Sequence, residues 1–522
     1  MASRAPASPL QRRISRAHSA LARSRFIMHS FTSAVRIAPD ALNDHIALAQ
    51  DCVVALNSAA RDAASNSAAP DGELRSVRRA RGLDAASTAR ARAQDVVVSA
   101  LTSSLSPASA REAIKVSLSD CLACSGCVTS AESVLLEEQS IDECVAACAS
   151  IANDANSAVV VSISAQSRAS LCLAYDMEDD DVAAALSGAF KAALGASKCY
   201  DARDARDVSL VEMYAEFCER MRDGRAPMLA SACPGWVCYA EKVHGALAIP
   251  YMSETKSPQQ IMGTFVKTAC ARELGVMGRN VYHVSVMPCY DKKLEASRED
   301  FKRDGAKEVD VVLTTGEVSA LIERLGFSHL RECPRGKIDR WVTIDRCAPE
   351  SAHAAPAVSS SGAYAEYVFR RFAAEAHGVD VGEIEWVTLR NADMREATLV
   401  VNGVVVLRVA VAYGFRNIQN LVRSLKMKKS PYAFVEVMAC PSGCLNGGGQ
   451  MPAREGMTNK ELIDSLDEKY RNVAHARAVA DVGALYRDWI GGEPGSDAAK
   501  DALRTKFHVR ERTVGLVQIN NW

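Results

Sequence analysis

The chain has 522 residues, a formal net charge of −1 at pH 7 and 48% hydrophobic residues. Balanced charge gives no reason to expect direct nucleic-acid binding, and the length suffices for roughly three folded domains. No uncharged apolar run reaches the roughly 20 residues of a membrane span. The nearest candidate, Ala397 to Tyr413, is interrupted by Asn402, Gly403 and Arg408 and predicts two strands joined by a turn. We therefore expect a soluble protein that does not insert into membranes.

Residues 1–27 contain six arginines and no acidic residue, a composition typical of an organelle presequence. A dispensable or untranslated extension before Met28 is the alternative interpretation. From Met28 we expect an N-terminal domain over residues 28–150. Its residues 58–111 are rich in Ala, Ser and Arg, which predicts a flexible insertion.

The cysteine content indicates metal or thiol chemistry. The chain has 17 cysteines and no apolar signal-peptide core at its start, so a secreted disulfide scaffold is disfavoured. Cys121, Cys124 and Cys127 form a Cys-x2-Cys-x2-Cys loop. This loop suits an iron–sulfur cluster better than zinc, because zinc knuckles favour paired Cys-x2-Cys units. Cys144 and Cys148 stand one helical turn apart and are interpreted as packing residues.

The middle of the chain alternates β-rich and amphipathic segments, which predicts α/β lobes over residues 151–455. Strands are expected at Val159–Ile163, Val281–Val286, Val309–Leu313 and Pro431–Ala439, and a helix at Ile418, Leu421, Val422 and Leu425. The segments from Cys199 to Arg225 and from Ala348 to Ser361 are interpreted as surface insertions.

Four further cysteines stand beside proline or glycine where predicted strands end: Cys233, Cys289, Cys440 and Cys444. Proline fixes the chain direction at a strand tip, and α/β sheets place their sites at the tips of parallel strands. The glycines at 447–449 would let backbone N–H groups approach a bound group closely. Any one of these thiols alone fits a buried small hydrophobic residue, but four in the same context favour a second metal site.

These motifs resemble those of the iron-only hydrogenases, and more closely those of the hydrogenase-like NARF family of cytosolic iron–sulfur assembly factors. The resemblance runs from Met28 to the C-terminus, and Asp120–Glu132 and Glu436–Gln450 carry it most specifically. It implies two α/β lobes of iron-only hydrogenase type with a cluster in the cleft, preceded by a small N-terminal iron–sulfur domain. A helical tail over residues 456–522, similar to a hydrogenase small subunit, completes the implied fold.

The resemblance also implies two 4Fe-4S clusters. One would be held by Cys52, Cys121, Cys124 and Cys127, and the other by Cys233, Cys289, Cys440 and Cys444. Lys292, Glu295 and Met438 match residues that line the hydrogenase cofactor, and Ser257–Gln260 matches a segment that borders it. A surface ion pair on a helix is the alternative interpretation of Lys292 and Glu295.

One departure from the hydrogenase pattern bears on activity. Hydrogenases carry a proton-relaying cysteine just before the equivalent of Cys233, and this chain has Ala232 there. An alanine methyl cannot exchange a proton, and a positioned proton donor typically contributes about 10²–10⁴-fold to a rate. We therefore expect no enzyme activity and assign no catalytic residue.

The leading hypothesis is a cluster carrier or adaptor in cytosolic iron–sulfur protein assembly. It would pass 4Fe-4S clusters to recipient apoproteins through the targeting complex of WD40-repeat and HEAT-repeat proteins. The terminal Trp522 would dock on that complex, because an indole fills a pocket and a carboxylate can be captured by donors. Two alternatives stay open: an iron-only hydrogenase or other redox enzyme, and a non-enzymatic nuclear prelamin-binding protein. The expected location is cytoplasmic, with the nucleus as a second location.

Overall fold

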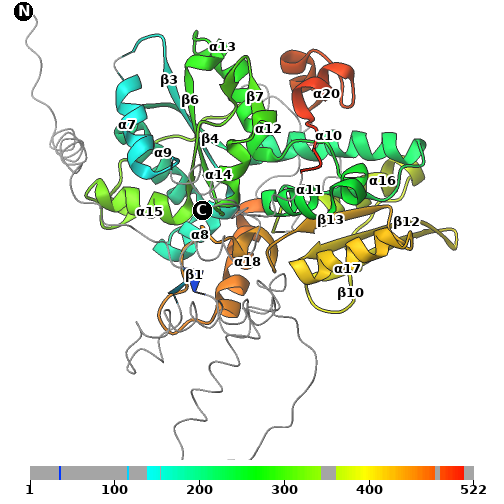
Figure 1. Ribbon diagram of the computed structural model, residues 1–522. Coiled ribbons are helices and arrows are strands. Elements are labelled where there is room, and N and C mark those ends of the chain that lie inside the picture. The colour runs from blue at the N-terminus through cyan, green and yellow to red at the C-terminus, as the bar shows by residue number, and fades with distance from the viewer. Residues whose placement is uncertain are drawn as a thin grey trace, which may run out of the picture. The chain divides into compact units, whose positions relative to one another are not determined.

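The computed structural model describes residues 35–36, 115–116, 138–152, 154–341, 360–475 and 482–510. The chain divides into two compact units: Phe31–Gly126 forms one, and Met1–Ser30 with Cys127–Trp522 forms the other. In the first unit, strands β1 (Val35–Arg36) and β2 (Lys115–Val116) form an antiparallel pair. The other described elements belong to the second unit, which contains two lobes (Figure 1).

The first lobe is built on a four-stranded parallel sheet in the order β4-β3-β6-β9. Its strands are β4 (Ala196–Asp201), β3 (Ala158–Ile163), β6 (Val281–Met287) and β9 (Val311–Thr314). Every residue of β3 is buried, as expected for a parallel strand that is covered on both faces. Val159, Val161 and Ile163 join one hydrophobic core and Val160 joins the other, because successive side chains of a strand point to opposite faces.

The second lobe is built on a five-stranded mixed sheet in the order β10-β11-β12-β13-β5. Its strands are β10 (Val387–Thr388), β11 (Met394–Val401), β12 (Val404–Tyr413), β13 (Phe434–Met438) and β5 (Met228–Ala230). β12, β13 and β5 run parallel, whereas β10 and β11 are antiparallel additions. β11 and β12 confirm the two strands predicted between Ala397 and Tyr413. Asn402 and Gly403 join them, and both have positive φ.

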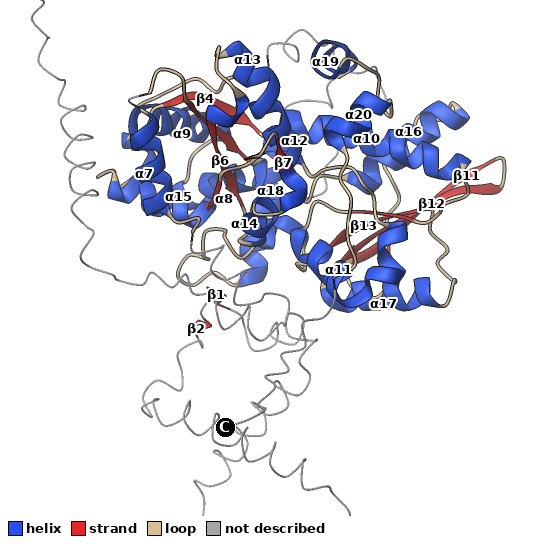
Figure 2. Ribbon diagram, turned by 45° about the horizontal axis from the view of Figure 1, so that its top comes forward, coloured by secondary structure: helices blue, strands red, loops and turns tan. Residues whose placement is uncertain are grey.

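Helices cover the sheets of both lobes. They are α7 (Ile141–Ile151), α8 (Ala165–Tyr175), α9 (Asp179–Ala193), α10 (Arg203–Arg222), α11 (Pro234–Ala248), α12 (Pro258–Phe265), α13 (Ala271–Glu273), α14 (Asp291–Ala296), α15 (Thr315–Arg324), α16 (Tyr364–His377) and α17 (Phe415–Lys426). Figure 2 shows α10 and α16 on one side of the second sheet and α11 and α17 on the other. A short hairpin of β7 (Lys302–Arg303) and β8 (Ala306–Lys307) follows α14.

The predicted strands at residues 159, 281, 309 and 431 and the predicted helix around Ile418 are confirmed by β3, β6, β9, β13 and α17. Cys144 and Cys148 are buried in the core of the first lobe, as the packing interpretation expected. Ser140 caps α7, because its hydroxyl accepts a hydrogen bond from the Glu143 backbone N–H at 3.2 Å.

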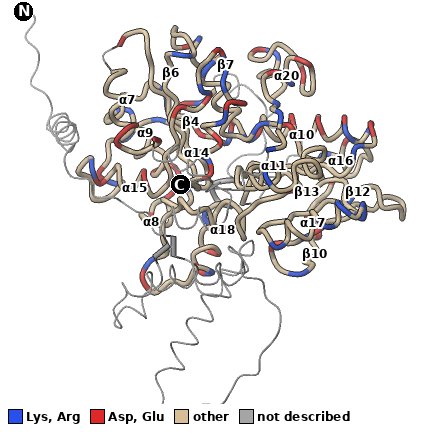
Figure 3. The backbone as a smooth tube through the Cα atoms, in the orientation of Figure 1, with Lys and Arg blue, Asp and Glu red and all other residues tan. Residues whose placement is uncertain are grey.

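The prediction of a surface insertion from Cys199 to Arg225 was wrong. This segment forms β4 and α10, and α10 packs against α12 and α16. Its charged residues are paired inside the protein instead of being solvated: Glu216 accepts a hydrogen bond from Arg220 at 2.9 Å, and both side chains are less than 5% exposed. Buried charges are tolerated when they are paired and hydrogen-bonded. Figure 3 shows acidic and basic residues interspersed along the described parts of the chain.

The C-terminal part is helical where it is described. α18 (Asn459–His475) packs on α8, and α19 (Gly483–Leu485) and α20 (Asp497–Leu503) follow. Arg504 then ties the chain to α10 through Glu212, at 2.7 Å, and Glu219, at 2.9 Å. The segment 505–510, here called the C-terminal strap, lies against α11, where Glu241 accepts a hydrogen bond from the His508 backbone N–H at 3.0 Å.

Several predicted features lie outside the described residues: the extension 1–27, the insertion 58–111, and most of the segment from Ala348 to Ser361. Among the helices that are described, none combines the length and the apolar character needed to cross a membrane.

His283 in β6 gives the fold a pH dependence that can be measured. Its Nε2 lies 2.9 Å from Ser162 Oγ and its Nδ1 lies 3.1 Å from the Glu308 carbonyl oxygen, and burial lowers its pKa to about 3. In the unfolded chain a histidine takes up a proton near pH 6.5. The unfolded state therefore binds more protons between these two pKa values, and the free energy of unfolding decreases as the pH falls below about 6.5.

Between about pH 7.5 and pH 5.5, His283 should lower the free energy of unfolding of the unaltered protein by about 1.4 kcal/mol. We expect the His283→Gln variant to lack this part of the decrease. Urea unfolding of the two proteins at both pH values measures this difference, with His377→Gln on the partly exposed end of α16 as a control. An unchanged pH dependence in the His283 variant would contradict the assignment.

Candidate metal centre

Three strand ends from the two lobes bring four cysteines together. β5 leads to Cys233, which is the N-cap of α11, and β6 leads to Cys289. β13 leads to Cys440, and Cys444 lies in the short 3-10 helix η8 (Gly443–Asn446). The Ala439 backbone N–H lies 3.4 Å from Cys233 Sγ and donates to it. The Gly449 N–H donates to the Pro288 carbonyl at 2.9 Å, so the loops that carry all four thiols are in direct contact.

The electrostatics of these thiols favour a positively charged occupant. Burial raises the pKa of Cys233 to about 12, and the charges of Asp291 and Cys444 add to the rise. Burial likewise raises the pKa of Cys289, Cys440 and Cys444, and the first two are raised further by the charges of the other thiols. Four thiolates cannot share this space unless a cation compensates them.

The donor set fits an iron–sulfur cluster. Thiolates are the ligands that such clusters take, and a four-iron cluster places one thiolate on each iron. Among the described residues, no three His, Cys, Asp or Glu side chains are arranged to hold a single metal ion. Backbone N–H groups of Ala439 and Trp236 reach Cys233 and stabilise its thiolate, as donors to cluster sulfurs do.

The loop after β13 depends on glycine at two positions. Gly443 has φ +74°, a conformation that L-residues adopt only with strain. Gly447 sits against the segment that carries Cys289: a methyl group added there would lie 2.4 Å from the Pro288 carbonyl oxygen. The sequence predicted that glycines here let backbone approach a bound group, and the structure shows in addition a close approach between two loops of the protein.

Lys292 and Glu295 form an ion pair at 2.8 Å on α14, and their side chains are only 9% and 8% exposed. The alternative of a surface ion pair is therefore wrong. Ser257 joins the pair: its hydroxyl donates to Glu295 Oε1 at 2.5 Å and accepts from Lys292 Nζ at 3.2 Å. Met438, the last residue of β13, is buried at 1% exposure beside this region, with its sulfur 4.0 Å from the Ser231 hydroxyl.

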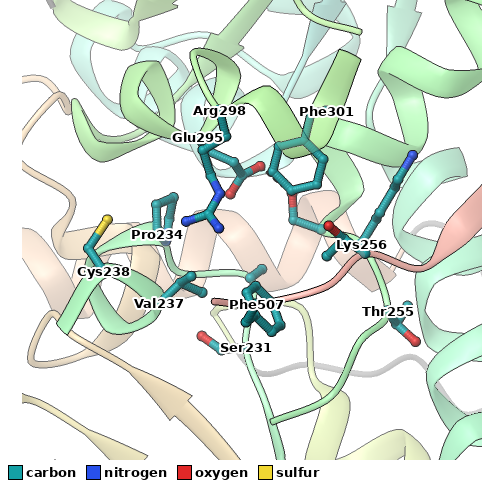
Figure 4. Close-up of a pocket in the computed structure, with 13 residues that line it drawn as sticks. Ser231, Pro234, Val237, Cys238, Thr255, Lys256, Glu295, Arg298, Phe301 and Phe507 are labelled. Atoms are coloured by element: carbon teal, nitrogen blue, oxygen red, sulfur yellow. Dashed lines mark hydrogen bonds between the residues drawn. The ribbon is translucent and has the colours of Figure 1, made fainter. Parts of the chain in front are cut away.

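A small cavity borders the loop that carries Cys233, on the side of α11 and the C-terminal strap (Figure 4). Its volume is ≈ 30 Å³, and Ala232, Ser257 and Glu295 are among its lining residues. Figure 4 shows Arg298 and Glu295 on one side of it and Val237 and Phe507 on another. This volume accommodates about one or two water molecules.

Sequence reasoning missed two residues of this site. Asp291 acts electrostatically on three of the four thiols, and its position two residues after Cys289 was a signal that could have found it. Ser361 is buried and its hydroxyl accepts a hydrogen bond from the Cys444 backbone N–H at 2.9 Å. It had been assigned to a surface insertion because its neighbours are Ala and Ser. The N-terminal ligand candidates Cys52, Cys121, Cys124 and Cys127 lie outside the described residues.

The fold is that of an iron-only hydrogenase. The FeFe-hydrogenase HydA1 of Chlamydomonas reinhardtii, solved in its apo form, matches with a TM-score of 0.60 at 23% identity, covering 71% of this chain and 99% of that one. A second solved structure, the HydA(deltaEFG) hydrogenase, gives a TM-score of 0.58 and covers 70% of this chain and 99% of its own.

The sequence matches narrow the class further. The family model for the iron-only hydrogenase large subunit, C-terminal domain, matches residues 157–448. Protein NAR1 of Arabidopsis thaliana is 43% identical over 444 residues, covering 80% of this chain and 91% of its own. Cytosolic iron-sulfur assembly component 3 of Mus musculus is 46% identical over 414 residues, covering 77% and 85%. The chain therefore belongs to the NARF-like branch of the iron-only hydrogenase family.

Proposed function

We propose that this protein is an iron–sulfur cluster carrier or adaptor in cytosolic iron–sulfur protein assembly. The observation that carries the proposal is the convergence of Cys233, Cys289, Cys440 and Cys444, whose thiolate forms would be stable together only with a cation bound among them. The names of the relatives, an iron–sulfur assembly component and cluster assembly factors, support the same process and a cytosolic location. The second cluster, at Cys52, Cys121, Cys124 and Cys127, is part of the proposal.

A hydrogenase activity is not part of it. Ala232 lines the cavity beside the cysteines, and its methyl group cannot relay a proton. The buried Lys292–Glu295 pair is proposed to line the cluster site as a positioning element and not as a catalytic one.

The route to recipient apoproteins is proposed to run through the cytosolic targeting complex, with Trp522 as the docking residue. The C-terminal strap supports this role, because Glu241 and Asp300 hold His508 to the body of the protein, at 3.0 Å in both cases. A firmly anchored strap gives a short terminal segment a fixed origin, which lowers the entropy lost on docking.

Transfer from the anaerobically loaded protein to an apo 4Fe-4S acceptor tests the proposal. We expect acceptor activation to be faster when the targeting complex is present, and deletion of Trp522 to abolish that acceleration without changing the slow transfer that occurs alone. The full-length donor and the donor without Trp522 must contain the same amounts of iron and acid-labile sulfide and give the same EPR spectra. If the targeting complex accelerates transfer equally from both donors, Trp522 is not the docking residue. If the reconstituted donor holds no cluster, the proposed function is wrong.

A further inference from the structure

The loop between Cys440 and Cys444 holds two consecutive residues in a left-handed conformation. Ser442 has φ +58° and ψ +10°, and Gly443 has φ +74°. Glycine adopts this conformation freely, whereas a residue with a Cβ atom adopts it only with strain. Because the strained Ser442 lies between two of the four cysteines, the observed shape of the loop depends on contacts that hold Ser442 in place.

A carboxylate from the second lobe supplies one such contact. The Ser442 backbone N–H donates to Asp393 Oδ1 at 2.6 Å. Asp393 precedes β11 and is itself fixed in position: its carbonyl oxygen accepts from the Tyr413 N–H at 2.9 Å, and its N–H donates to Asn391 Oδ1 at 3.0 Å. A hydrogen bond to a charged acceptor is roughly twice as strong as a neutral one. The bond from Ser442 to Asp393 therefore opposes the backbone strain at Ser442.

Two serines that precede α16 hold the same loop through other groups. Ser360 Oγ donates to the Ser442 carbonyl oxygen at 3.1 Å, and Ser361 Oγ accepts from the Cys444 N–H at 2.9 Å. These serines and Asp393 are all distant from the loop in sequence. Tertiary contacts, and not the local sequence alone, thus impose the shape that brings Cys440 and Cys444 to the other two cysteines.

We propose that Asp393 is a positioning residue that holds the Cys440–Cys444 loop in its cluster-binding shape and thereby sets the rate at which the C-terminal cluster is released. The inference rests on the proposed function, because it requires a cluster at the four thiols. Strain at Ser442 favours opening of the loop, and the bond to Asp393 opposes it. On release, each cysteine sulfur leaves its iron with the bonding electron pair and a ligand of the acceptor takes its place, so no electron is transferred.

The test measures how fast bathophenanthroline disulfonate, an iron chelator, removes iron from the full-length protein after anaerobic reconstitution. All chains carry Cys124→Ala to remove the predicted N-terminal cluster. Asp393→Ala should release iron about tenfold faster than this parent, whereas Asp393→Asn, which keeps an oxygen acceptor, should stay within about threefold of it. Ser442→Gly should release iron about fivefold more slowly, because glycine removes the strain. Combining Asp393→Ala with Ser442→Gly should largely cancel the two effects.

Lys428→Gly is the matched control. Lys428 also has a positive φ, +53°, but it follows α17 and lies outside the cysteine loop. It should relieve the same kind of strain without slowing release from either the parent or Asp393→Ala. If Lys428→Gly slows release as much as Ser442→Gly does, general stability explains the effect and the inference is wrong.

Iron content and the EPR spectrum before chelation must match among the chains whose rates are compared. Should Asp393→Ala take up no cluster, its combination with Ser442→Gly is expected to take one up again, which the Lys428→Gly combination should not do. Equal release rates in the parent, Asp393→Ala and Ser442→Gly would contradict the inference and leave the proposed function standing. A parent protein that holds no cluster would overturn the proposed function, and the inference with it.

Discussion

Replacing Gly447 by alanine is expected to empty the C-terminal cluster site while leaving both lobes folded. The added methyl group would lie 2.4 Å from the carbonyl oxygen and 3.0 Å from the carbonyl carbon of Pro288, and both atoms belong to backbone that cannot rotate away. This steric clash can be relieved only if the loop that carries Cys444 moves away from the loop that carries Cys289. Catalytic and metal geometries tolerate only about 0.5 Å of such displacement.

Iron and acid-labile sulfide per chain measure the effect, and we expect the Gly447 variant to lose about four of about eight irons. Gly382→Ala is the matched control, because a methyl group there meets no heavy atom within 4 Å. Full iron content in the Gly447 variant would show that the two loops can part without loss of the cluster. Circular dichroism and urea unfolding report whether the lobes remain intact.

Cys440→Ala is expected to have an effect of the same size by a different route. It removes a thiolate and leaves the backbone unchanged, so one iron of the cluster loses its ligand in a site where the remaining thiols still repel one another. The EPR signal of one reduced cluster should disappear and the other should persist. The proposed N-terminal cluster at Cys52, Cys121, Cys124 and Cys127 is expected to be the one that persists.

Cys218→Ala serves as the control, since this thiol lies on α10, away from the four cysteines, and is only partly buried. Loss of both EPR signals in Cys440→Ala would mean that the two clusters depend on each other. Retention of both would remove Cys440 from the ligand set. Activation of an apo acceptor by the same samples tells whether the C-terminal cluster is the one transferred.

The approach of the C-terminal cysteines to one another was predictable because short sequence motifs around each cysteine indicate it. A thiol next to Pro288 or Pro441 at the end of a valine-rich run marks the end of a strand, and parallel strands of α/β sheets end at the same edge. These two rules group Cys233 with Cys440, because β5 and β13 lie in one sheet, whereas Cys289 follows β6 of the other sheet and was grouped with them through its own strand-end context and the family resemblance. The prediction of which side chains surround them was harder, because those contacts join residues far apart in sequence.

One wrong prediction and one rejected alternative have the same physical origin. α10 was taken for a surface segment because it is rich in charge. Its Glu212, however, pairs inside the protein at 2.7 Å with Arg504, which lies 292 residues further along the sequence. Lys292 and Glu295 were weighed as a surface pair for the same reason. Sequence shows the charge of a residue but not its partner, and burial of charge is decided by the partner.

The position of β5 in its sheet has a consequence for biosynthesis. β5 leads directly into Cys233, and its partner in the sheet is β13, which pairs Met228 with Phe434. A ribosome therefore releases Cys233 roughly two hundred residues before the strand that fixes it exists. Such long-range pairing forms late. Iron delivered to the nascent chain would meet separate thiols, so loading of this site has to wait until translation has passed Cys444, whereas a motif such as Cys121–Cys127 is complete much earlier.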